Sequence, residues 1–133
     1  MINGQLIVPV HPVVIVVDDD AAVLGSLKFA LEIEGFAVRA YSTGDAVFND
    51  SGLADCACFI IDQKLPGLTG LEVVAALRER KIGAPAILIT SHPTIVLQER
   101  AAKAGVAIVE KPLLSNALLE RVRDVIARPR TTH

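Results

Sequence analysis

Acidic side chains occur at two places in the chain directly after runs of apolar residues. Asp18 and Asp19 follow the β-branched run of residues 13–17, and Asp62 follows the apolar run of residues 57–61. Carboxylates held close together repel each other, and a hard divalent cation such as Mg²⁺ relieves this repulsion because it prefers oxygen ligands. Together the three residues would suit a magnesium site with a carboxylate nucleophile.

Two further polar residues follow later apolar runs and could act on a phosphoryl group. Thr90 comes after residues 86–89, and Lys111 comes shortly after residues 106–109. A lysine ammonium is a point charge suited to a phosphate oxygen, and a threonine hydroxyl can donate a hydrogen bond to another oxygen. A carboxylate, a metal, a cation and a hydroxyl are the parts that phosphoryl transfer needs.

Each of these residues, taken alone, also has a structural interpretation. An acid after a strand often caps the next helix, which is the role we expect for Asp20. A threonine after a strand is often a turn residue, and a lysine before a proline is often a solvated surface charge. The functional interpretation rests on all of them falling at the ends of predicted strands.

Strand and helix patterns alternate along almost the whole chain. Strands are predicted near residues 13–17, 36–41, 57–61, 86–89 and 106–109, with a helical pattern after each one. Five such units predict an α/β fold in which helices cover both faces of a parallel sheet. Ligands of such open sheets bind outside the carboxyl ends of the strands, where the polar residues above are placed.

Composition excludes several classes of function. The chain has 133 residues and a formal net charge of −2 without a lysine or arginine run, so we expect one domain and no direct nucleic-acid partner. No apolar run is long enough to span a membrane and the first residues lack a signal-peptide pattern, so we expect a cytoplasmic protein without a membrane partner. Cys56 and Cys58 are expected to be structural thiols near a strand.

Four motifs in order resemble the receiver domains of two-component response regulators, over residues 13–126. They are VVIVVDDD at 13–20, CFIIDQKLPGLTGLEVV at 58–74, AILITS at 86–91 and AGVAIVEKPL at 104–113. The resemblance implies a flavodoxin-like (βα)5 fold, doubly wound, with strand order 2-1-3-4-5. It divides the chain into an N-terminal extension (1–12), a receiver domain (13–127) and a C-terminal tail (128–133), with no output domain.

The resemblance also implies a role for each matching residue of the site. Asp62 would be the phosphoacceptor. Asp19 would bind Mg²⁺, or Mn²⁺, directly, and Asp18 would support the ion. Asp62 and the backbone carbonyl of Lys64 would complete the protein ligands of the metal.

Four more residues have implied roles in holding and signalling the phosphoryl group. Lys111 would pair with the phosphoryl group, and the Lys111–Pro112 peptide would be cis. Thr90 would move to hydrogen-bond the phosphoryl group, as the switch. Receivers often carry a Tyr or Phe three residues before the lysine, where this chain has Ile108, so the usual output mechanism is in question.

The partners implied are a sensor histidine kinase or a histidine phosphotransfer protein, and the chain would be a phosphoacceptor rather than an enzyme. Two alternatives stay open. One is a receiver fold that only docks, independent of phosphorylation. The other is an aspartyl-phosphate phosphatase of the haloacid-dehalogenase kind, disfavoured because Lys64 stands where that class has a second Asp. A nucleotide-binding enzyme is weaker still, because residues 18–25 lack the glycines that approach a pyrophosphate.

Overall fold

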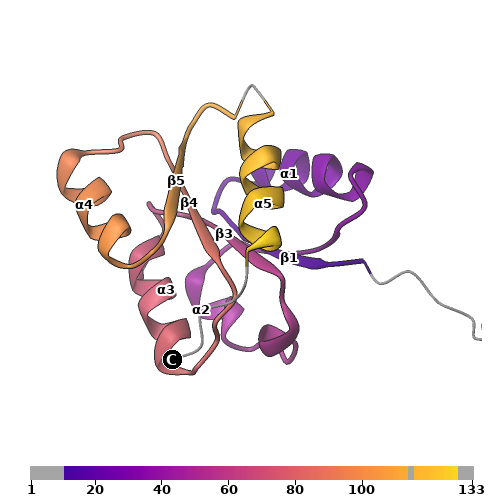
Figure 1. Ribbon diagram of the computed structural model, residues 1–133, viewed down its shortest axis with the longest axis horizontal. Coiled ribbons are helices and arrows are strands. Elements are labelled where there is room, and N and C mark those ends of the chain that lie inside the picture. The colour runs from indigo at the N-terminus through magenta and orange to yellow at the C-terminus, as the bar shows by residue number, and fades with distance from the viewer. Residues whose placement is uncertain (1–10, 114–115, 129–133) are drawn as a thin grey trace, which may run out of the picture.

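A computed structural model describes residues 11–113 and 116–128 of the chain (Figure 1). The predicted N-terminal extension and C-terminal tail therefore lie almost entirely outside the described residues. Strands and helices alternate, with one short 3₁₀ helix between α2 and β3. In chain order they are β1 (Val13–Val17), α1 (Ala21–Ile33), β2 (Ala37–Tyr41), α2 (Gly44–Val47), η1 (Leu53–Asp55), β3 (Cys58–Asp62), α3 (Gly70–Glu79), β4 (Ala86–Thr90), α4 (Ile95–Lys103), β5 (Ala107–Glu110) and α5 (Ala117–Ala127).

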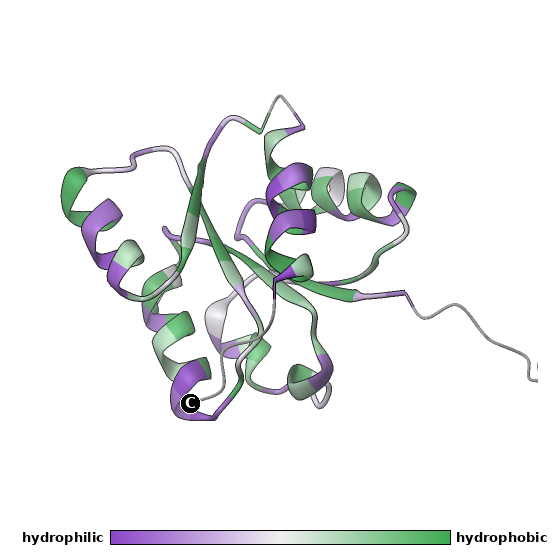
Figure 2. Cartoon of the chain, viewed as in Figure 1, coloured by the Kyte–Doolittle hydropathy of each residue, from purple (hydrophilic) through white to green (hydrophobic). Residues whose placement is uncertain are grey.

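The five strands form one parallel sheet in the order β2-β1-β3-β4-β5. This is the predicted doubly wound, flavodoxin-like fold. One apolar cluster joins the sheet to α2, α3 and α4, and a second joins it to α1 and α5. The helices thus cover both faces, and Figure 2 shows the strands between them as mostly hydrophobic.

Strand β1 shows how the sequence builds both clusters at once. Ile15 and Val17 belong to the cluster with α3, and Val14 and Val16 belong to the cluster with α1. Successive side chains of a strand point to opposite faces, so a run of apolar residues is buried on both. All four side chains are fully buried, which explains why this strand reads as an uninterrupted apolar run.

Four helices begin at residues whose side chains cap them, among them α2, where Thr43 accepts from Ala46 N. The Asp20 carboxylate accepts a hydrogen bond from Ala22 N at 2.9 Å and begins α1, as predicted. Thr69 begins α3 with a capping box, and Thr94 begins α4. These caps satisfy backbone N–H groups that the first turn of a helix leaves without partners, so the helix starts are fixed close to the functional edge of the sheet.

Strands β2, β3 and β5 begin one residue later than the sequence pattern predicted. In β2 and β5 the cause is the end of the preceding helix. Phe36 N donates to Leu31 O and Val106 N donates to Ala101 O, at 3.1 and 2.9 Å. Each of these bonds closes the end of the preceding helix, so neither N–H is available to the sheet. Strand β5 therefore runs from Ala107 to Glu110, and Lys111 follows it directly.

The remaining sequence expectations concern the thiols and the membrane. Cys56 and Cys58 are both fully buried, as expected, and burial raises the pKa of the Cys58 thiol. Within the part of the chain that the structure describes, no helix has the length and apolar character needed to cross a bilayer.

Asp50 joins β2 to the loop after α2 by a hydrogen-bond network that the sequence did not reveal. Its carboxylate accepts hydrogen bonds from Arg39 Nε at 2.7 Å, from Gly52 N at 2.7 Å and from the Tyr41 hydroxyl. Only 4% of the Asp50 side chain is exposed. Burial favours a raised pKa, but the hydrogen bonds from Tyr41 and Arg39 outweigh it and lower the pKa of Asp50.

Replacing Asp50 with Ala should therefore destabilise the fold. We expect the free energy of unfolding to fall by about 1–2 kcal/mol, because the change leaves several partly buried donors without their acceptor. The folded state lowers the Asp50 pKa, so the stabilisation is full above the unfolded-state pKa and is lost as the pH falls through the folded-state pKa. Urea unfolding at neutral and acidic pH would check both points. Asp55→Ala, at an exposed position, is the control; equal stability of the two variants at neutral pH would refute the role of the network.

Candidate functional site

The carboxyl ends of four strands bring the predicted functional residues to one edge of the sheet. Asp18 directly follows β1, and Asp62 is the last residue of β3. Val17 of β1 pairs with Ile61 of β3, so the residues that follow them, Asp18 and Asp62, lie side by side. Thr90 ends β4, and Lys111 follows β5 and donates its N–H to Thr90 O at 2.8 Å.

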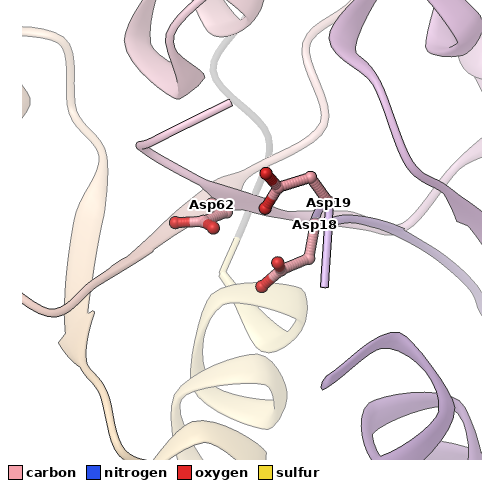
Figure 3. A group of neighbouring side chains, drawn as sticks. All are labelled: Asp18, Asp19 and Asp62. Carbon is pink, nitrogen blue, oxygen red and sulfur yellow. The ribbon is translucent and has the colours of Figure 1, made fainter. Parts of the chain in front are cut away.

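Asp18, Asp19 and Asp62 form an acidic cluster at this edge (Figure 3). One carboxylate oxygen from each residue lies within 4.8 Å of those of the other two. Asp18 is fully buried and Asp62 is 5% exposed, while Asp19 is exposed to solvent. In Figure 3 the carboxylates of Asp18 and Asp19 extend from the end of β1 toward Asp62. The cluster is thus open on the Asp19 side and enclosed by protein on the other.

Lys111 supplies the positive charge of the site. Its Nζ lies 3.0 Å from Asp18 Oδ2 and 3.2 Å from Asp62 Oδ2. Its side chain is only 19% exposed, so water screens these contacts less than it would at the surface. The Lys111–Pro112 peptide is cis, as the resemblance implied. Lys111 is therefore held between the two buried carboxylates.

The surroundings raise the pKa of both Asp62 and Lys111, for different reasons. Burial, with the charge of Asp18 added, raises the pKa of Asp62 even though Lys111 opposes the shift. Burial alone would lower the pKa of Lys111, but its hydrogen bonds to Asp18 and Asp62 outweigh burial and raise it. Lys111 is therefore protonated at neutral pH, while the Asp62 carboxylate is disfavoured by its surroundings without a further cation.

The donor set fits a hard divalent cation. Three carboxylates and one ammonium leave two negative charges at the cluster, which one divalent ion would neutralise. Asp18 Oδ1 accepts a hydrogen bond from Asp20 N at 2.9 Å, and Asp62 Oδ1 accepts one from Lys64 N at 3.2 Å. These bonds fix the orientation of both buried carboxylates. Oxygen ligands of this kind, with an open side for water, suit Mg²⁺.

Thr90 lies at the same edge but is engaged elsewhere. Its Oγ1 accepts a hydrogen bond from His92 N at 3.1 Å, in the loop between β4 and α4. It also lines an open pocket of about 310 Å³ between this loop, the start of α4 and residues 63–64. His92 is exposed. The structure therefore brings Asp18, Asp19, Asp62 and Lys111 together and directs Thr90 toward the loop.

Ile108 lies in β5 at the switch position that the resemblance implied. It pairs with Leu88 of β4 and packs, partly buried, against the apolar cluster on the α3 and α4 side of the sheet. Val109, the next residue, packs on the α5 side. Ile108 is thus an apolar side chain at the edge of the hydrophobic core, and it has no polar group that needs contact with water.

Sequence reasoning missed one residue beside the site, Gln63. Its side-chain Oε1 accepts a hydrogen bond from Leu71 N, at the start of α3, at a distance of 2.9 Å. The sequence shows only a polar residue next to Asp62, and no spacing rule connects it to a backbone N–H eight residues later. A side-chain contact with a helix start of this kind depends on how the loop folds.

The chain matches the model of a known domain family and resembles proteins of one functional class. The response regulator receiver domain model matches residues 14–123. The chain is 38% identical over 122 residues to the transcriptional regulatory protein FixJ of Azorhizobium caulinodans, which covers 90% of this chain and 56% of that protein. It is 35% identical over 115 residues to the response regulator protein TmoT of Ectopseudomonas mendocina, covering 86% of this chain and 52% of that protein. The chain therefore spans about half the length of these curated relatives.

Solved structures show the same fold. The beryllium fluoride-activated DrrB receiver domain has a TM-score of 0.80 at 26% identity, covering 90% of this chain and all of that one. A CheY-like receiver domain protein from Methanospirillum hungatei JF-1 has a TM-score of 0.79 at 26% identity, covering 88% of this chain and 94% of that one. With the parallel sheet and the acidic edge described above, these matches show that the chain belongs to the response regulator receiver domain family.

Proposed function

We propose that the chain accepts a phosphoryl group on Asp62, with the help of Mg²⁺ or Mn²⁺, in two-component signalling. The donor would be the phosphohistidine of a sensor kinase or of a histidine phosphotransfer protein. The observation that carries the proposal is the position of Asp62, whose carboxylate lies among Asp18, Asp19 and the ammonium of Lys111. Because kinases of this kind use ATP, we propose a cytoplasmic location.

The residues of the site divide the chemistry among them. An Asp62 carboxylate oxygen attacks phosphorus, the new O–P bond forms, the N–P bond to the histidine breaks, and the imidazole leaves with the electron pair and takes up a proton. Asp18, Asp19, Asp62 and the Lys64 carbonyl would hold the metal, which when bound supplies positive charge to the phosphoryl oxygens. Lys111 Nζ, 3.2 Å from Asp62 Oδ2, is placed to pair with the transferred group.

The chain would act as the acceptor in this reaction and as the catalyst of its own phosphorylation and dephosphorylation, not as an enzyme with a separate substrate. Its signal would pass to a protein partner. The match covers only about half the length of these relatives, so their activity as whole proteins indicates only the class of signalling.

A phosphoryl mimic tests the proposal without a cognate kinase. Beryllium fluoride added with Mg²⁺ should shift the amide resonances around Asp62, Thr90 and Lys111 beyond any change that Mg²⁺ alone produces, and beryllium fluoride without Mg²⁺ should have no effect. A receiver fold that only docks, independent of phosphorylation, predicts no such shift. An unchanged spectrum at saturating beryllium fluoride and Mg²⁺ would therefore favour the docking alternative.

Phosphorylation should move the β4–α4 loop more than β5. The Thr90 hydroxyl accepts a hydrogen bond from His92 N in the present state, and turning toward a phosphoryl group would release His92 and Pro93. Ile108 is β-branched with a restricted side-chain torsion, and it has no polar tip that must choose between water and the interior. A smaller change is therefore expected on the face formed by α4, β5 and α5.

Amide exchange with and without beryllium fluoride would measure this difference. We expect protection changes concentrated at residues 90–94, with smaller ones at residues 106–113. Changes of equal size in both segments would show that the coupling to β5 operates without an aromatic side chain at position 108.

A further inference from the structure

Gln63 connects the end of β3 to the start of α3 through both its backbone and its side chain. Its backbone N–H donates to Ile89 O at 3.0 Å, and its backbone O accepts from Gly70 N at 3.0 Å. Its side-chain Oε1 accepts from Leu71 N at 2.9 Å. One residue thus ties the sheet and the first turn of the helix together, directly beside Asp62.

The close approach of α3 to β3 leaves this arrangement little freedom. A Cβ atom at Gly70 would lie 2.7 Å from Asp62 O and 3.0 Å from the Cα atom of Gln63. The helix therefore starts directly on the backbone that carries the acceptor carboxylate. The loop between Gln63 and Gly70 is held at both of its ends, and Leu65 within it is buried.

This loop contains Lys64, whose backbone carbonyl is the proposed metal ligand. Lys64 N donates to Asp62 Oδ1 at 3.2 Å, so the peptide before Lys64 is already fixed to the acceptor carboxylate. The position of the Lys64 backbone carbonyl, which belongs to the peptide after Lys64, depends on the path of the loop. That path is set by the bonds that join Gln63 to the start of α3.

We propose that Gln63 is a positioning residue for divalent metal binding, because its side-chain bond to Leu71 holds the loop that places the Lys64 carbonyl beside Asp62. The inference rests on the proposed function, since it concerns the metal that phosphorylation of Asp62 would require. Gln63 itself touches neither the metal nor the phosphoryl group in this account.

The start of α3 offers a matched control. Thr69 Oγ1 accepts from Glu72 N at 3.2 Å, and Glu72 Oε1 accepts from Thr69 N at 2.8 Å. This capping box stabilises the same helix turn as the Gln63 bond, but it lies within the helix start and makes no contact with Gln63. If Gln63 had only a structural role, losing its bond to Leu71 and losing the Thr69 cap would have the same effect on Mg²⁺ affinity.

Magnesium titration by calorimetry should separate the two roles. Gln63→Met keeps the length of the side chain but removes the acceptor, and we expect Mg²⁺ to bind about threefold to tenfold more weakly, as the loss of one hydrogen bond implies. Thr69→Ala should lower the melting temperature and leave the Mg²⁺ affinity near the natural value. Gln63→Glu, which retains an acceptor oxygen, should restore the slow amide exchange of Leu71 that Gln63→Met loses.

The outcomes distinguish this inference from the proposed function. Natural Mg²⁺ affinity in Gln63→Met, or an equal loss of affinity in Thr69→Ala, would overturn the positioning role while phosphorylation of Asp62 could still stand. Failure of the natural protein to bind Mg²⁺ would overturn both. Should Gln63→Met not fold, Gln63→Asn, whose amide is one carbon shorter, carries the same expectations.

Discussion

Replacing Asp62 with Asn is expected to abolish phosphoryl incorporation completely. The amide has nearly the shape of the carboxylate but lacks a nucleophilic anionic oxygen, so no acyl phosphate can form. Incubation with acetyl phosphate and Mg²⁺, followed by intact-mass measurement, would quantify the loss. Asp62 lies between the ends of β1 and β4, with the Lys111 ammonium 3.2 Å from its Oδ2, so the variant removes the one carboxylate that is paired with both neighbouring strands.

Asp55→Asn is the control for this experiment. Asp55 is an exposed carboxylate in η1, which precedes the amino end of β3, whereas Asp62 lies at the carboxyl end of that strand. Its replacement should leave labelling at the natural level. Stable labelling of the Asp62→Asn variant at another side chain would show that Asp62 has been assigned the wrong role.

Replacing Asp19 with Ala is expected to weaken Mg²⁺ binding by about tenfold to a hundredfold, because even groups that only support metal ligands have effects of this size. Asp19 is the exposed member of the acidic cluster, so its removal should not disturb the core. The same change removes like-charge repulsion from the metal-free cluster and should raise the melting temperature without Mg²⁺. Calorimetric titration and thermal unfolding measure the two effects.

Asp20→Asn provides the comparison for the loss of one negative charge at this edge. Asparagine can still cap α1 as Asp20 does, and Asp20 lies outside the cluster of three carboxylates. We expect its Mg²⁺ affinity to stay within about twofold of the natural value, because exposed charges are screened by salt. Similar losses of affinity in both variants would indicate that Asp19 acts only through general charge.

The main residues of the site could be predicted because strand ends are visible in the sequence. Asp18, Asp62 and Thr90 each end a fully apolar run, and parallel strands bring such ends to one edge. The resemblance to receiver domains also implied the strand order, which the structure confirms. These predictions were possible because the alternation of apolar strands and helices is visible in the sequence, and the geometry of a parallel sheet then determines where the residues at the strand ends lie.

The contacts that could not be predicted depend on how loops fold. Gln63 reaches Leu71 only because the loop after β3 returns to the sheet, and Asp50 reaches Arg39 only because the chain turns back after α2. The delayed start of β5 has a similar origin, since the end of α4 uses the N–H of Val106. The orientation of the Thr90 hydroxyl toward His92 is likewise set by one local hydrogen bond.

The measurement that most directly tests the central claim is the location of the phosphoryl group in the natural chain. The protein would be incubated with acetyl phosphate, with and without Mg²⁺, and the modified peptide identified by mass spectrometry. We expect one phosphoryl group per chain, on Asp62, formed only when a divalent cation is present. Phosphoryl transfer to a different residue, or equal labelling of Asp62 after chelation of all divalent cations, would contradict it.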